Sequence, residues 1–89
     1  MAEKYEFIVT DPMGLHAKPL TVLVNEASKY DSVVKLIYER KEANLKSIMG
    51  TMALGVPTKA RLIIEVEGQD EQEAIEKLKL VLKEQKITD

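Results

Sequence analysis

The amino-acid sequence predicts an α+β fold, an open-faced β-sandwich in which a four-stranded antiparallel sheet carries three helices on one face. Hydrophobic residues recur with the periods of strands and helices in the order β-α-β-β-α-β-α. The two central strands follow each other too closely for the crossover that parallel pairing requires. No repeat, linker or low-complexity segment divides the chain, so we expect a single domain spanning residues 1–89.

The first strand is predicted at residues 4–10, and the first helix from residue 17 to about residue 30. In the strand, Tyr5, Phe7 and Val9 fall on one face, and strong strand formers occur throughout. In the helix, the apolar residues that recur on one face are Leu20, Leu23, Val24 and Ala27. Both elements therefore have a side to bury against a common core.

The middle of the chain is predicted to form two strands and a short helix. Residues 33–39 alternate with strand periodicity, and residues 42–45 are the simplest continuation as a second strand. No Asn-Gly or Asp-Gly marks a tight turn between them. Ser47 is a favourable N-cap for a helix through Leu54, and Gly55, with a proline close behind, is a stop signal.

The last strand and the last helix have the clearest patterns. Residues 59–67 alternate cleanly, and Gly68 ends the strand. Asp70, followed three residues later by Glu73, resembles a capping box. The helix that follows is expected to run to about Gln85. Its apolar stripe consists of Ala74, Ile75, Leu78, Val81 and Leu82.

Composition argues against several classes of function. Thirteen basic and fifteen acidic residues give a net charge of −2, which provides no electrostatic basis for nucleic-acid binding. The absence of cysteine and the presence of a single histidine argue against disulfides, thiol catalysis and a metal site, and we expect no cofactor. No signal-peptide pattern or membrane-spanning apolar run is present, so we expect a cytoplasmic protein without membrane insertion.

The single histidine, His16, lies at the predicted start of the first helix. Pro19 fits where a helix needs no backbone N–H, which places His16 at or near the N-cap. The free amides of Ala17 and Lys18, with the Lys18 ammonium, would then hold an anion bonded to the imidazole. A neutral imidazole could attack a phosphoryl donor and carry the group as a phosphoramidate. The alternative is that His16 only caps or packs.

Ser47 and the short helix behind it form a second candidate region. An ordinary N-cap explains a serine at this position. The alternative is phosphorylation, since a phosphoserine at a helix N-terminus gains from the helix dipole and the free amides. The short helix is apolar on nearly every side and cannot bury them all. We therefore expect Ile48, Met49 and Met52 to form an exposed contact patch, the alternative being that all three belong to the core.

Residues 14–19, Gly-Leu-His-Ala-Lys-Pro, are similar to the GLHARP-type active-site motif of the HPr family, the histidine-containing phosphocarriers of the bacterial sugar phosphotransferase system. Residues 44–50, Asn-Leu-Lys-Ser-Ile-Met-Gly, resemble its regulatory-serine motif. The two motifs occur in the family's order, and the resemblance extends over essentially the whole chain. It implies the same four-stranded sheet with three helices on one face.

The resemblance implies a role for each matching residue. His16 would accept a phosphoryl group on Nδ1 from phosphorylated enzyme I and pass it to enzyme IIA domains of sugar permeases. Ser47 would be a substrate of HPr kinase/phosphorylase. Phosphorylation there would slow transfer at His16 and favour binding to a transcriptional regulator of carbon catabolite control. Ile48, Met49 and Met52 match the family's hydrophobic docking patch. The protein would then be a covalent intermediate and no enzyme in its own right, and we expect a monomer.

Two positions depart from the family pattern. Lys18 stands where arginine is usual, which keeps the charge but loses the planar fork that grips phosphate at two points. Leu20 stands where small residues are usual. Together with Met13, it is expected to add bulk around His16 and to take part in partner binding.

Three functions are compatible with these residues. The first is the phosphocarrier. The second is an HPr-like regulatory binding module that acts mainly through docking of phospho-Ser47, and the third is a generic ligand-binding domain in which both motifs are accidental. The presence of His16 favours the first, because family members of the second kind lack the active histidine.

Overall fold

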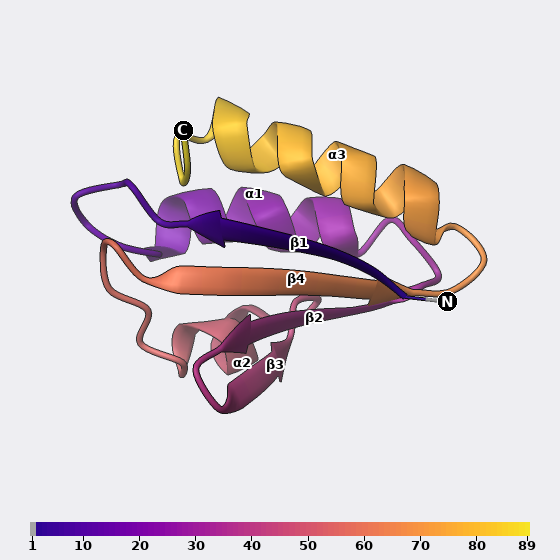
Figure 1. Cartoon of the computed structure of the whole chain (residues 1–89), viewed down its shortest axis with the longest axis horizontal. Helices are drawn as coiled ribbons and strands as arrows, with labels where there is room; N and C mark the ends of the chain where they lie inside the picture. The colour runs from indigo at the N-terminus through magenta and orange to yellow at the C-terminus, as the bar shows by residue number, and fades with distance from the viewer. Residues whose placement is uncertain (1) are drawn as a thin grey trace.

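The computed structural model describes residues 2–89, and it confirms the predicted order of elements (Figure 1). The strands are β1 (Glu3–Ile8), β2 (Val33–Tyr38), β3 (Lys41–Asn44) and β4 (Arg61–Glu67). The helices are α1 (Ala17–Ala27), α2 (Ile48–Met52) and α3 (Glu71–Glu84). The strand order in the sheet is β1-β4-β2-β3, and every neighbouring pair is antiparallel. In Figure 1, α1 and α3 run along the sheet, and α2 lies near β3.

One face of the sheet forms the core with the helices. Leu62 of β4 lies opposite Phe7 of β1, and Ile64 of β4 lies opposite Leu36 of β2, so all four side chains share a face. All four are buried, as are the apolar stripes predicted for α1 and α3. The period-two and period-3.6 patterns therefore identified this core correctly.

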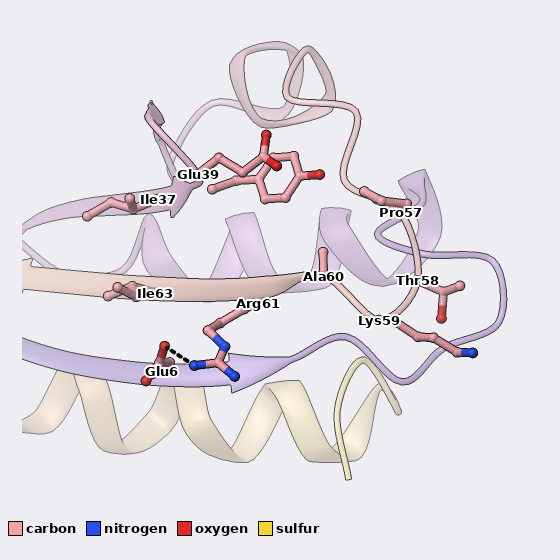
Figure 2. Close-up of a pocket in the computed structure, with 10 residues that line it drawn as sticks. Glu6, Ile37, Glu39, Pro57, Thr58, Lys59, Ala60, Arg61 and Ile63 are labelled. Carbon is pink, nitrogen blue, oxygen red and sulfur yellow. Dashed lines mark hydrogen bonds and ion pairs between the residues drawn. The ribbon is translucent and has the colours of Figure 1, made fainter.

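The other face of the sheet is open. Ile63 of β4 lies between Glu6 of β1 and Ile37 of β2 on this face, and its side chain is only partly buried. A shallow pocket of about 510 Å³ occupies one end of the face, where Arg61 is 3.5 Å from Glu6 and residues 57–60 close the rim (Figure 2). None of the candidate site residues lines this pocket.

The strands β2 and β3 are joined by a tight turn that lacks the residues by which such turns are usually recognised in a sequence. Tyr38 pairs with Lys41, so only Glu39 and Arg40 form the turn. Glu39 has φ +56°, in the left-handed region that glycine or asparagine usually occupies. A tight turn therefore forms here without either residue.

The capping box predicted from Asp70 and Glu73 at the start of α3 is wrong, because these side chains do not make the expected hydrogen bonds. Asp70 is the N-cap residue, but its carboxylate does not cap the helix. It accepts hydrogen bonds from the backbone N–H groups of Asp31 and Ser32, at 2.9 and 3.0 Å, and from the Ser32 hydroxyl. Glu71, not Glu73, reaches back to the N–H of Gly68 at 3.0 Å. Asp70 thus ties α3 to the loop before β2, a contact that the local spacing did not indicate.

The residues after α3 fix the end of β1 that leads to His16. Ile87 is fully buried, and its carbonyl accepts a hydrogen bond from the N–H of Thr10 at 2.9 Å. The Thr88 hydroxyl donates to the carbonyl of Ile8 at 2.7 Å.

Within residues 2–89, no helix has both the length and the apolar character needed to cross a membrane.

Candidate functional site

The loop before His16 is anchored against the segment that follows α2. Gly14 has φ +73° and donates its N–H to the carbonyl of Asp11 at 2.9 Å, while buried Leu15 donates to the carbonyl of Val56 at 3.1 Å. A Cβ added to Gly14 would lie 2.7 Å from the Val56 oxygen, so glycine is required for this approach. The loop therefore holds His16 in a defined position.

His16 is the N-cap residue of α1, as predicted. Its backbone is extended, with φ −105° and ψ 172°, and its carbonyl accepts the N–H of Leu20 at 3.2 Å. The imidazole makes no capping hydrogen bond. Pro19 has no N–H, and the amides of Ala17 and Lys18 have no acceptor within residues 2–89. The first turn thus keeps two donors and the positive end of the helix dipole for an external anion.

The imidazole is hydrogen-bonded to a carboxylate that the sequence patterns did not identify. His16 Nε2 lies 3.1 Å from Asp11 Oδ2, and Asp11 Oδ1 accepts the N–H of Met13 at 2.9 Å. The hydrogen bond from Met13, and then the one from His16, hold the pKa of Asp11 below its usual value. The His16 side chain is 32% exposed, so the ring is supported on one side and accessible on another.

Lys18 lies in the first turn of α1 with its side chain exposed. Within residues 2–89, no carboxylate forms an ion pair with its ammonium group. The other described residues therefore leave this positive charge unneutralised, and the predicted role of Lys18 beside His16 stays a prediction.

The prediction that Leu20 takes part in partner binding is wrong. Its side chain is fully buried on the inward stripe of α1, next to Leu23 in the core. The helical period places residue 20 three positions before residue 23 on the same face, and this period overrides any nearness to His16 in sequence. Met13, in contrast, is 74% exposed in the loop that leads to His16.

Ser47 is the N-cap residue of α2, as predicted. Its hydroxyl oxygen accepts the N–H of Gly50 at 3.0 Å, and its carbonyl accepts the hydroxyl of Thr51 at 2.8 Å. The residue is half-buried. The serine hydroxyl is therefore already oriented toward the free amides of the helix.

The predicted exposed patch on α2 is confirmed as an exposed surface. Ile48, Met49 and Met52 are 38, 84 and 43% exposed, whereas Thr51 on the opposite side is buried. Helices α1 and α2 are in contact, and Val56, just after α2, bonds to the loop before His16. The two candidate regions are therefore physically connected.

Within residues 2–89, no group of three or more metal-binding side chains is assembled.

Comparisons with known proteins identify the family. The model for "PTS HPr component phosphorylation site" matches residues 3–84. A histidine-containing phosphocarrier protein of Mycoplasma is 38% identical, with a TM-score of 0.96 over 98% of this chain and 99% of the other. An HPr protein of Thermoanaerobacter tengcongensis is 38% identical, with a TM-score of 0.84 over 96% of this chain and 94% of the other.

A third solved structure is the catabolite-repression protein Crh of Bacillus subtilis, described as a dimer with a swapped domain. It is 42% identical, with a TM-score of 0.73 over 83% of this chain and 85% of the other. The family model matches residues 3–84. The Mycoplasma and Thermoanaerobacter phosphocarriers share the fold of this chain over nearly the whole length of both chains. The chain therefore belongs to the HPr family of phosphocarrier proteins of the phosphotransferase system.

Proposed function

We propose that this protein accepts a phosphoryl group on Nδ1 of His16 from phosphorylated enzyme I and passes it to enzyme IIA domains of sugar permeases. The observation that carries the proposal is the state of the ring. His16 Nε2 is hydrogen-bonded to Asp11, the ring is partly exposed, and the amides of Ala17 and Lys18 have no acceptor among the described residues. The Nδ1 lone pair attacks phosphorus, a P–N bond forms, and the bond between phosphorus and the donor breaks. The protein is a carrier and turns over no substrate alone.

The first turn of α1 supports this role electrostatically. A phosphoryl group on His16 would face the amides of Ala17 and Lys18 and the positive end of the helix dipole, worth about 0.3–1 kcal/mol for an exposed anion. The Lys18 ammonium, which forms no ion pair with the other described residues, adds a second cationic contribution. The two amides are fixed by the fold before the phosphoryl group arrives, so little reorganisation of these donors accompanies transfer.

The exposed residues of α2 supply the docking surface in this proposal. Ile48, Met49 and Met52 form an apolar patch on the helix that contacts α1. Methionine side chains are flexible and polarisable, which suits a surface that must meet both a donor enzyme and several acceptors.

We propose that phosphorylation of Ser47 by HPr kinase/phosphorylase regulates this docking. A phosphate adds a charge of about −1.5 to −2 directly beside the apolar patch, while the N-terminus of α2 can tolerate it. The modified protein would dock less well on the phosphotransfer enzymes and bind a catabolite-control transcriptional regulator instead. The similarity to Crh, whose name refers to catabolite repression, supports a regulatory branch. A purely regulatory module is the second candidate, and the exposed His16 favours the carrier over it.

The test is phosphoryl uptake from phosphoenolpyruvate in the presence of active enzyme I. We expect one phosphate per chain, labile in acid and stable in base, as a phosphoramidate requires. His16→Ala should take up none, whereas Ser47→Ala should still be labelled. An unlabelled wild-type protein, beside a control carrier that is labelled by the same enzyme I, would reject the proposal.

We further propose that the carrier is a monomer in the cytoplasm, as the resemblance of its motifs to the HPr family implies. Size-exclusion chromatography with light scattering should give the mass of one chain at micromolar concentration. A swapped dimer like that described for Crh would contradict this.

A further inference from the structure

We propose that Asp11 is a positioning residue for phosphoryl transfer, which holds the His16 ring with its proton on Nε2 and leaves the Nδ1 lone pair free to react. The inference rests on the proposed function and adds to it the group that selects the reactive nitrogen. The carrying observation is the contact of 3.1 Å between His16 Nε2 and Asp11 Oδ2.

The carboxylate is itself held in place. Asp11 Oδ1 accepts the N–H of Met13, and the carbonyl of Asp11 accepts the N–H of Gly14, both at 2.9 Å. Thr10, the residue before it, is bonded to the carbonyl of Ile87. Backbone contacts therefore fix Asp11 on both sides, and the second oxygen is directed at the ring. An acceptor held this way can orient an imidazole, as a carboxylate does in other histidine sites.

The protonation state of the pair follows from hydrogen-bonding capacity. An ionised carboxylate only accepts hydrogen bonds, and neutral imidazole carries one N–H. The hydrogen bonds that lower the pKa of Asp11 keep it ionised at neutral pH. The N–H of His16 therefore lies on Nε2, and Nδ1 has the lone pair.

The same contact stabilises the product of the transfer. When Nδ1 forms its bond to phosphorus, the electron pair of the donor bond leaves with the donor, and the ring becomes cationic while it keeps the proton on Nε2. Asp11 then faces a positive charge instead of a neutral N–H, so Coulomb attraction between carboxylate and ring is added to the hydrogen bond. On transfer to an acceptor, the charge on the ring disappears again without loss of that proton.

No other carboxylate competes for the ring. Within residues 2–89, Asp11 is the one acidic group in ion-pair distance of His16. Lys83 and Lys86 line a surface hollow together with Asp11, but neither forms an ion pair with it among these residues. The Asp11 oxygen that faces His16 is thus committed to the imidazole.

Asp11→Asn tests the inference because it reverses the polarity of this one contact. The asparagine oxygen can still accept the N–H of Met13, which places its NH₂ group where Oδ2 was. That group donates to Nε2 and moves the ring proton to Nδ1, the nitrogen that must react. The corresponding change in a serine protease lowers kcat about 10⁴-fold through the wrong tautomer. For this exposed site, we expect a decrease of at least about tenfold in the rate of phosphoryl uptake.

The tautomer is measured on the protein alone, from the ¹⁵N chemical shifts of the His16 ring at neutral pH. Wild type should show the proton on Nε2, and Asp11→Asn should show it on Nδ1. Asp31→Asn is the matched control: it removes the same charge at the far end of α1, where Asp31 forms no side-chain ion pair with the other described residues. It should change neither the tautomer nor the rate.

Transfer is measured with two donors, phosphorylated enzyme I and the small molecule phosphoramidate, which releases ammonia. If enzyme I fails to label wild type, the proposed function is rejected, and the phosphoramidate rate still decides the role of Asp11. A wild-type proton on Nδ1 would overturn the inference. So would an Asp11→Asn protein that reacts with phosphoramidate at the wild-type rate.

Discussion

The two short segments that start α1 and α2 are built alike and used differently. Each helix begins with an N-cap residue in extended conformation, His16 for α1 and Ser47 for α2. Ser47 uses its side chain to cap the helix, through the hydrogen bond from Gly50. The His16 side chain makes no such bond: its ring is hydrogen-bonded to Asp11, and the first two helix amides have no acceptor among residues 2–89.

This difference separates the chemistry from its regulation. At His16, the cost of an uncapped helix end is offset by the packing of α1 in the core, so the ring and two amides are available to a phosphoryl group. At Ser47, the hydroxyl supports a helix of five residues that has one buried side chain. Any modification there changes the helix and the exposed patch on it together.

The largest expected effect concerns two glycines, one in the loop before His16 and one just after α2. In Gly14→Ala, alanine would have to adopt φ +73° with its Cβ 2.7 Å from the carbonyl oxygen of Val56. We expect a loss of about 3 kcal/mol in the free energy of unfolding, from the left-handed backbone and the clash together. Gly55→Ala is the matched control, since φ is +62° there but, apart from the two chain neighbours, no described residue has an atom within 4 Å of the new Cβ. It should cost about 1 kcal/mol. Urea denaturation measures both, and equal losses would show that the loop does not rely on this close approach.

Ser47→Asp should have the next largest effect, on transfer from enzyme I. A negative charge beside Ile48 and Met49 opposes apolar docking, so we expect uptake at His16 to slow about tenfold, equivalent to 1.4 kcal/mol. The rate with phosphoramidate should stay near that of wild type, because this donor needs no docking patch. A tenfold loss with both donors would mean that the α2 substitution disturbs the His16 loop itself.

Lys18 should have a smaller effect that appears in the His16 region alone. Its exposed ammonium is unpaired among the described residues, so Lys18→Glu should slow uptake about fivefold by placing a negative charge beside the incoming phosphoryl group. Lys18→Arg should match or exceed wild type, since guanidinium grips phosphate at two points. The initial rate of labelling measures both variants. Equal rates for Lys18→Glu and wild type would show that this cation is unimportant.

The fold could be predicted nearly completely because its signals are local and repetitive. The alternation in residues 59–67 and the apolar stripe of α3 identified their buried faces. The N-cap roles of His16 and Ser47 followed from the residues that favour helix starts and stops near each of them. Element ends were less accurate: α1 stops at Ala27, three residues before the predicted end. Frayed helix ends depend on tertiary contacts that periodicity does not contain.

The parts of the site that were missed depend on backbone geometry or on conflict between signals. Asp11 reaches His16 across a loop in which Gly14 has a left-handed backbone, a geometry that the residue spacing does not specify. Leu20 was assigned both to the core stripe and to the contact surface, and the helical period settles this in favour of the core. Asp70 had the residue pattern of a capping box, but a partner far away in sequence, Ser32, takes its carboxylate.

The smallest expected effect compares the two N-caps directly through stability. Ser47→Ala removes the acceptor for the N–H of Gly50 and should lower the free energy of unfolding by about 1 kcal/mol. His16→Ala removes no capping bond, only a partly exposed hydrogen bond to Asp11, so it should cost about 0.5 kcal/mol. Thermal and urea unfolding of the two variants under one condition measure the difference. If His16→Ala destabilises the protein more than Ser47→Ala, the imidazole contributes to the stability of the fold. The contrast between the two N-caps, in which Ser47 stabilises its helix and His16 is free for transfer, would then be wrong.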